Sequence, residues 1–161
     1  MFRIACFCVV LMVFSCTEPA PALPTKEPSL EKGLLLGIAV GDSISSLSKR
    51  VHLVAKNEQL YELVAQQLYE IPAEVHVVVS VVDSVVRHLD ADIFPADSST
   101  HRTLWDKLKE ASTSIYGSGS ENNGFAGWRM TSPEGTIHEC FLFNESREVG
   151  KPYIRLEAYE Q

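Results

Sequence analysis

The sequence has few basic side chains and little cysteine outside its N-terminal end. Lys and Arg together number 14 against 21 Asp and Glu, for a formal net charge of −7, and the basic residues form no cluster. This balance argues against nucleic acid as a partner and against charge-driven binding to anionic lipid headgroups. Three of the four cysteines are Cys6, Cys8 and Cys16, which leaves only Cys140 in the body of the chain.

The N-terminal apolar run is too short to cross a membrane as a helix. Ile4 to Phe14 are 11 uncharged and mostly apolar residues, whereas a bilayer core of about 30 Å needs ~20 helical residues. Arg3 before the run and the small residue Ser15 after it are typical of a cleaved signal peptide. The run therefore predicts export rather than a transmembrane helix.

Val13-Phe14-Ser15-Cys16 closes this run and resembles the lipobox of bacterial lipoproteins. The resemblance implies a signal peptide over residues 1–15, cleavage before Cys16, and lipid on the sulfur and new amino group of that cysteine. Two or three acyl chains anchor a protein stably, since each buried methylene contributes about 0.8 kcal/mol. Thr17 after the cysteine favours, by the same resemblance, the outer membrane of a Gram-negative cell, with the protein facing the periplasm. An ordinary secreted protein cut after Ala22 and an uncleaved anchor are the alternatives.

A tether and one domain are predicted after the cleavage site. Residues 16–32 hold four of the eight prolines, Pro19, Pro21, Pro24 and Pro28, and few bulky apolar groups. Such a composition forms a semi-rigid spacer. Residues 33–161 are long enough for a single hydrophobic core. With Cys16 lipidated, Cys140 has no disulfide partner, so packing must supply the stability of the domain.

Hydrophobic periodicity predicts the elements of the first half. Ile44, Leu47 and Val51 recur at helical spacing after the candidate caps Asp42 and Ser43, which predicts a helix of two to three turns. Residues 58–71 also fit a helical period better than strict alternation, although a strand beginning near Leu68 remains open. Residues 75–82 are rich in valine and predict a strand, with a hairpin at Asp83-Ser84 leading to a second strand.

The second half predicts one long helix followed by three strands. The helix spans residues 100–116, with Leu104, Leu108, Ala111 and Ile115 on one stripe and Gly117 as its C-terminal cap. Strands are expected through Trp128 and Met130, from Ile137 to Phe143, and from Tyr153 to Tyr159. In the last strand Ile154, Leu156 and Ala158 share one face.

These elements predict an α+β fold with helices packed on an antiparallel sheet. Residues 42–94 and 100–159 each read as a helical segment followed by strands, so two such repeats are one version of this fold. The Gly37-x-x-x-Gly41-Asp-Ser opening resembles the small assembly lipoproteins of the SmpA/OmlA (BamE) type and the two-repeat β-lactamase inhibitor proteins. That resemblance implies a glycine-bounded stretch before a helix that packs on the sheet.

No catalytic, metal or cofactor site is expected. Gly41-Asp-Ser43 resembles the nucleophile block of the GDSL/SGNH hydrolases, but the chain has no Asp-x-x-His element to supply a base, and serine without a base is a poor nucleophile. His88, Asp90, Asp92, Asp97 and His101 form a polar stretch that is better explained as a solvated face than as a metal site. Cys140 alternates with His138 and Leu142, which is typical of a buried apolar residue.

The remaining functional signal is a set of aromatic residues on the last strands, namely Trp128, Phe141, Phe143, Tyr153 and Tyr159. Trp128, Tyr153 and Tyr159 are the candidate interaction face, because exposed aromatics on a sheet favour protein binding. Packing within the core is the alternative for the same residues. We therefore expect a non-enzymatic binding or envelope-assembly lipoprotein with a protein partner. An inhibitor or immunity-type lipoprotein against a cell-envelope hydrolase is the alternative, and an esterase using Ser43 is the remote one.

Overall fold

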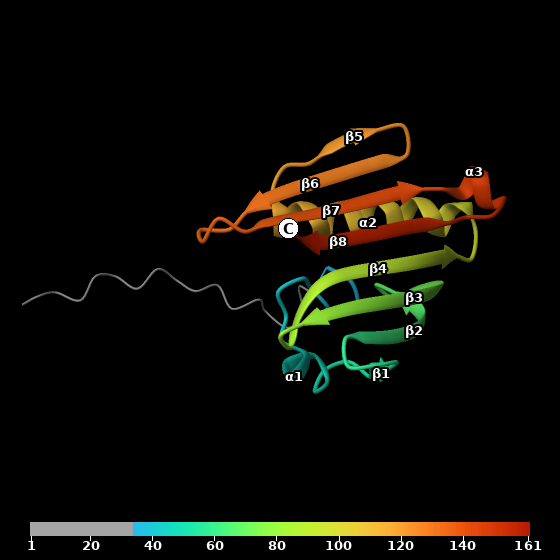
Figure 1. The fold of residues 1–161 in the computed structure, drawn as a ribbon. Coiled ribbons are helices and arrows are strands. Elements are labelled where there is room, and N and C mark those ends of the chain that lie inside the picture. The colour runs from blue at the N-terminus through green and yellow to red at the C-terminus, as the bar shows by residue number, and fades with distance from the viewer. Residues whose placement is uncertain (1–33) are drawn as a thin grey trace, which may run out of the picture.

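A computed structural model describes residues 34–161, and these form one antiparallel sheet with a single long helix (Figure 1). The strand order is β1-β2-β3-β4-β8-β7-β6-β5. The strands are β1 Val54–Ala55, β2 Leu60–Leu68, β3 Ile71–Val82, β4 Val85–Pro95, β5 Ser120–Asn122, β6 Phe125–Thr131, β7 Ile137–Asn144 and β8 Ile154–Glu160. The helices are α1 Ile44–Leu47, α2 Ser98–Tyr116 and α3 Ser146–Val149. The predicted signal peptide, the tether and Cys16 lie outside the described residues.

The predicted fold class, α+β with helices packed on an antiparallel sheet, is wrong. Strand makes up 48% of the structure and helix 21%, and the dominant element is the eight-stranded sheet. α1 and α3 are four residues each, so α2 is the one long helix of the described residues. The two-repeat version is wrong for the same reason, since the first half has only the four-residue α1 before its strands.

The largest local error concerns residues 58–71, which form β2 and the start of β3 rather than a helix. In β2 the residues Tyr61, Leu63 and Ala65 pair with buried valines of β3, while Leu60, Glu62 and Val64 alternate onto the other face. Apolar residues therefore occupy both faces, which hides the two-residue period of a strand. A two-residue turn at Tyr69-Glu70, with φ of 53° and 64°, joins β2 to β3, as in a type I′ hairpin.

Pro72 directly follows the residues that were predicted as a helix, and it lies at the second position of β3. It pairs with Gln67, directly after a register shift between Ala65 and Gln67 of β2. A β-bulge and a strand end are the places where a sheet tolerates proline, because the missing N–H then costs no ladder hydrogen bond. The proline therefore marks a strand boundary here.

The hairpin predicted at Asp83-Ser84 is confirmed. Val82 pairs with Val85, and the two turn residues have φ of 51° and 64°, which again fits a type I′ turn. The helix predicted over residues 100–116 is also confirmed as α2. Asp97 caps its N-terminus by accepting hydrogen bonds from the Ser99 and Thr100 amides, and Gly117 ends it.

The two halves of the chain join where β4 pairs with β8. Leu89 lies opposite Ala158, and Asp92 lies opposite Arg155. Every second side chain along β4 and β8 points to the core. These core-facing residues are all at most 1% exposed, namely Leu89, Ala91, Ile93, Ile154, Leu156 and Ala158. This pairing makes one continuous sheet and one core from both halves.

One face of the sheet, here called the covered face, holds this core. α2 crosses it behind β6, β7 and β8 (Figure 1) and buries Leu104, Trp105 and Leu108. Leu34, Leu35, Ile38 and Leu47 from the N-terminal part of the domain join the same cluster as the valines of β3. Among the described helices, none is long and apolar enough to cross a membrane.

Candidate functional site

The opposite face of the sheet, here called the open face, is the face on which α2 does not pack. No helix of residues 34–161 crosses it in Figure 1. The alternation is clearest in β3, where Ala73, Val75, Val77, Val79 and Val81 are buried and their neighbours are half-buried or exposed. Because successive strand residues point to opposite faces, the pairing register defines the side chains of the open face. Residues 34–161 therefore present a broad pleated surface to solvent.

Four aromatic side chains gather on the open face at the β6, β7 and β8 side. Phe125 lies 5.7 Å from Phe141 and 5.4 Å from Phe143 between ring centroids. Phe141 also lies 5.9 Å from Tyr159. These separations are typical of interacting aromatic pairs. All four rings are only partly buried, and we call Phe125, Phe141, Phe143 and Tyr159 the aromatic cluster.

A hollow of about 420 Å³ opens beside the aromatic cluster. Phe125 and Phe141 form its apolar wall, and Gly127 between them contributes no side chain. Residues 118–120 border it on the β5 side, and Arg129 and Glu139 border it on the β6 and β7 side. The hollow is therefore apolar at its wall and charged at its rim.

Charged side chains fill the middle of the open face as ion pairs. Arg155 of β8 lies 3.4 Å from Asp90 of β4 and 2.5 Å from Glu157. Its hydrogen bond to Asp90 is the main reason that the pKa of Arg155 is raised. Toward the aromatic cluster, Arg129 lies 3.7 Å from Glu139. Exposed pairs of this kind contribute little to stability, so they mainly set the charge pattern of the surface.

Tyr153, one residue before β8, lies at the end of the open face. Its hydroxyl donates a hydrogen bond to Asp92, and its ring stacks on Phe94 with centroids 5.0 Å apart and planes 16° apart. Lys151 Nζ lies 4.0 Å from the centroid of the same Phe94 ring, a cation–π geometry. Burial, and then the hydrogen bond to Asp92, raise the pKa of Tyr153. Only 8% of Tyr153 is exposed.

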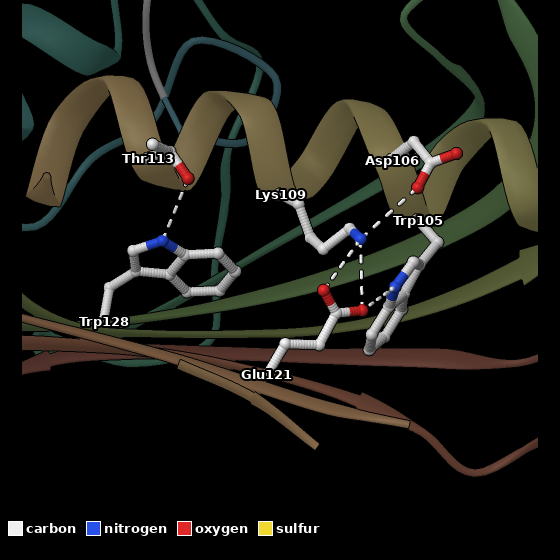
Figure 2. A network of polar contacts seen from close by, with 6 residues as sticks. All are labelled: Trp105, Asp106, Lys109, Thr113, Glu121 and Trp128. Carbon is white, nitrogen blue, oxygen red and sulfur yellow. Dashed lines mark hydrogen bonds and ion pairs between the residues drawn. The ribbon is translucent and has the colours of Figure 1, made fainter. Parts of the chain in front are cut away.

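The predicted interaction face of Trp128, Tyr153 and Tyr159 is not one surface. Trp128 lies on the covered face, 4% exposed, and its indole N–H donates to Thr113 Oγ1 of α2 at 3.1 Å (Figure 2). Tyr153 is nearly buried, and only Tyr159 belongs to the aromatic cluster. Trp128 lies one position after Gly127 and three positions after Phe125, so the alternation of the strand turns it to the other face, toward the helix. Phe125, which was not among the predicted aromatic residues, belongs to the aromatic cluster instead.

β5 is held against α2 by a polar network that the sequence did not reveal. Glu121 accepts hydrogen bonds from Lys109 Nζ, with 3.1 Å to each carboxylate oxygen, and from the Trp105 indole at 3.5 Å (Figure 2). Lys109 also lies 3.5 Å from Asp106. The hydrogen bond from Lys109 is the main reason that the pKa of Glu121 is lowered. The network fixes one border of the hollow, because β5 carries Ser120.

The polar stretch that was weighed as a metal site is divided between separate places. His88, Asp90 and Asp92 share the open face of β4. However, Asp90 accepts a hydrogen bond from Arg155, and Asp92 accepts one from Tyr153. Asp97 caps α2, and the His101 ring stacks on Trp105. Within residues 34–161 no three side chains of metal-binding type converge.

Within the part of the chain that the structure describes, no hydrogen-bond partner of Ser43 or Cys140 is a group that would activate it. Ser43 precedes α1, but its side chain makes no capping bond; its oxygen lies 2.8 Å from Ser45 Oγ instead. Cys140 is fully buried with its sulfur 3.5 Å from Ser112 Oγ. Burial raises the pKa of the Cys140 thiol to about 12, although the contact with Ser112 opposes the shift. A thiol with such a pKa is inert at neutral pH.

Comparison with known proteins found no family model, no curated protein and no solved structure that matches this chain. Function must therefore be inferred from the N-terminal motif and the open face. Within residues 34–161, the open face combines a surface formed by the eight-stranded sheet with clustered aromatic side chains.

Proposed function

We propose that the protein is a lipid-anchored bacterial lipoprotein whose domain binds a partner protein in the periplasm through the open face. The anchor is supported by the lipobox-like residues up to Cys16. The binding role is supported by one observation above all, the uncovered face of the sheet with its aromatic cluster. Aromatic side chains are enriched where protein interfaces derive their affinity.

The size of the open face fits a stable protein interface. Eight strands at about 4.8 Å spacing span roughly 34 Å, and strands of seven residues extend roughly 23 Å. The resulting area of roughly 800 Å² equals what one partner buries in an interface of standard size. Two exposed valines, Val54 of β1 at 50% and Val64 of β2 at 56%, lie at the other edge of the sheet from the aromatic cluster. They extend the apolar surface of the open face.

The charge of the domain favours a basic partner. Residues 34–161 contain 18 Asp and Glu against 11 Lys and Arg. The strands of the open face carry two arginines, Arg129 and Arg155, with Lys56 and Lys151 at the rims. Against these stand six carboxylates, Glu62, Glu74, Asp90, Asp92, Glu139 and Glu157. Complementary charge speeds association and selects partners, and it disfavours self-association of two acidic copies.

Site-specific photo-crosslinking in cells that express the full chain tests this proposal. A photoreactive phenylalanine analogue at Val78 or Phe143 samples the open face, and the same analogue at Lys107 or Glu110 on the exposed side of α2 is the matched control. We expect a discrete adduct with one basic envelope protein from the open-face positions only. Adducts of equal yield from α2, or none from the open face, would contradict the proposal.

A charge reversal separates specific docking from chance proximity. Glu74 is exposed, and its carboxylate lies 2.7 Å from Nε2 of the neighbouring His76, so Glu74→Lys should reduce the adduct yield without unfolding the domain. Glu110→Lys on α2 makes the same charge change away from the open face and should have no effect. If the adduct is a cell-envelope hydrolase whose activity falls on binding, the protein is an inhibitor or immunity factor.

A further inference from the structure

A second pocket, of about 490 Å³, lies at the end of the sheet where β4 leads into α2 and β7 leads into α3 (Figure 1). Ser98 and His101 of α2 line one side of it, and residues of the segment 144–152 line the other. We call it the basic pocket. It shares no lining residue with the hollow beside the aromatic cluster. Its volume falls in the range of small-molecule sites, about 300–1,000 Å³.

Two cations and no carboxylate line the basic pocket. The cations are Arg147 and Lys151. Within residues 34–161, six of the eleven Lys and Arg side chains form ion pairs, and these two are among the five that do not. The contact of Lys151 Nζ with the Phe94 ring positions the ammonium group without neutralising its charge. The pocket is therefore positive in a domain whose net charge is negative.

His101 supplies an independent observation at the same place. Its Nε2 is the one buried side-chain nitrogen or oxygen of the described residues that has no hydrogen-bond partner. The ring stacks on Trp105, with centroids 6.4 Å apart and planes 8° apart, so packing fixes its position. Buried polar atoms are normally satisfied by protein, by ordered water or by an ion. An unsatisfied imidazole nitrogen beside two unpaired cations points to a ligand that accepts hydrogen bonds.

The positive character of the pocket does not come from the N-terminus of α2. Asp97 accepts hydrogen bonds from the Ser99 and Thr100 amides, so the first turn of the helix already has an anionic partner. The side chains of the two cations are therefore what an anion would meet. Asn144 adds a further donor, because its side-chain oxygen accepts from the Ser146 amide and its NH₂ group remains available.

We propose that the basic pocket binds a small organic anion through an oxyanion group, either a carboxylate or a phosphate. Arg147 offers a planar fork of donors to two oxygens of such a group, and Lys151 adds a second positive charge. Nε2–H of His101 gains the acceptor that it lacks. The organic part of the ligand then lies against Gly150 and Pro152, which also line the pocket. This inference is independent of the proposed function, because a ligand held here needs no contact with the aromatic cluster.

Titration with matched charged and uncharged compounds tests the basic pocket. The full chain, purified in a non-ionic detergent and labelled with ¹⁵N, receives glutarate or glycerol 3-phosphate at constant ionic strength. Glutaramide and glycerol are their uncharged controls, and inorganic phosphate is the control for an ion without an organic part. We expect saturable shifts of the signals of Ser98, His101 and Gly150 with at least one organic anion. Val78 on β3 should not respond. The anion that saturates first identifies the preferred acid group.

Three substitutions separate the pocket from general surface charge. The double variant Arg147→Gln with Lys151→Gln should weaken binding about tenfold or more, because each lost cation removes a charge-assisted hydrogen bond. Lys107→Gln is the matched control, since Lys107 is an exposed and unpaired cation of α2 that does not line the pocket. His101→Phe keeps a ring against Trp105 and removes the nitrogen, so it should also weaken binding.

The proposal is overturned if neither organic anion gives saturable shifts, or if the double variant binds them as well as Lys107→Gln does. Shifts of equal size with inorganic phosphate, growing linearly with concentration, would also overturn it, because they indicate attraction to exposed charge only. Binding that His101→Phe leaves unchanged would assign the unsatisfied nitrogen to an ordered water and remove His101 from the site. Saturation that is lost in the double variant and kept in Lys107→Gln supports the proposal.

Discussion

The Tyr153 hydroxyl donates a hydrogen bond to the Asp92 carboxylate, linking the segment before β8 to the middle of β4. The two strands also pair directly, with Asp92 opposite Arg155. Because β4 and β8 belong to different halves of the chain, this contact lies at the junction that makes the sheet continuous. The open face is therefore reinforced by a side-chain contact where its two halves meet.

Tyr153→Phe should destabilise the domain. The substitution keeps the ring that stacks on Phe94 and removes the donor to Asp92. Hydrogen bonds to charged groups contribute about 1.5–3 kcal/mol, so we expect a loss of about that size in urea unfolding. Tyr159→Phe is the control, since the Tyr159 hydroxyl is also paired with a carboxylate, that of Glu139, but at a more exposed position, so its loss should be smaller. Equal losses in both variants would contradict the role of Asp92.

Leu156→Ala should lower the free energy of unfolding far more than a substitution at its neighbour Glu157 on the opposite face. Leu156 is fully buried on the covered face, and such truncations cost about 2–5 kcal/mol because they leave a cavity. Glu157→Ala, one residue later on the open face, should change the free energy of unfolding by less than about 1 kcal/mol. Chemical denaturation of both variants measures the difference. A larger effect at Glu157 would invert the assignment of the two faces.

Stability should fall as the pH rises above about 9. Burial raises the pKa values of the Cys140 thiol and the Tyr69 hydroxyl to about 12, whereas in unfolded chains these groups ionise near about 8.5 and 10. The unfolded state therefore loses its protons first, and each group removes roughly 1 kcal/mol per pH unit within its window. The stability that these groups contribute is complete below the unfolded pKa values.

Urea unfolding at a series of alkaline pH values measures this loss. Cys140→Ala removes the thiol, so the decline of its stability should begin only near the pKa of unfolded tyrosine, about 10. Superimposable pH profiles of the two proteins between about pH 9 and 10 would show that the buried thiol does not contribute.

Glu121→Gln should loosen β5 without unfolding the domain. The change removes the negative charge that pairs with Lys109 and keeps an acceptor for the Trp105 indole. Amide exchange at Ser120, Glu121 and Asn122 should accelerate while the thermal midpoint stays nearly constant, because exposed ion pairs contribute little globally. Ser118→Ala is the control in the preceding loop. Unchanged exchange in β5 would mean that backbone pairing with β6 suffices to hold it.

Cys16→Ala should release the protein from the membrane fraction. The prediction follows from the lipobox-like residues alone, because the acyl chains on Cys16 would provide the anchor. Fractionation of cells together with the mass of the purified N-terminal peptide measures the outcome. Ser15→Ala keeps a small residue before the cysteine and should leave lipidation intact. A protein that stays on the membrane after signal cleavage without Cys16 would refute the lipid anchor.

The elements with strong local signals were predictable. The hairpin at Asp83-Ser84 follows from valine-rich segments on both sides of a polar pair, and α2 follows from its apolar stripe and caps. β2 was not predictable in the same way, because it has apolar residues on both faces and its turn, Tyr69-Glu70, lacks the usual Asn or Gly. Whether such a segment forms a strand depends on its pairing with the neighbouring strand β3.

The sequence predicted the type of residue at the candidate site but not most of the individual residues. The sequence indicated that aromatic residues of the last strands form a face, and Tyr159 belongs to it. Trp128 was misplaced, since which of two alternating positions faces solvent depends on where the helix packs. Phe125 and Gly127 belong to the site because Phe141 of the neighbouring strand lies against them. No local sequence pattern shows that strand pairing.

The sequence by itself determined the strong turns, the long helix, the alternation of β8 and the prediction of a lipid-bearing Cys16, because these depend on residues within a few positions of each other. Only the tertiary structure decided that all eight strands form one sheet with a covered and an open face. That outcome depends on β4 pairing with β8 across more than sixty residues of the chain. The entropic cost of closing so long a loop is offset only by the hydrophobic core that the two halves share.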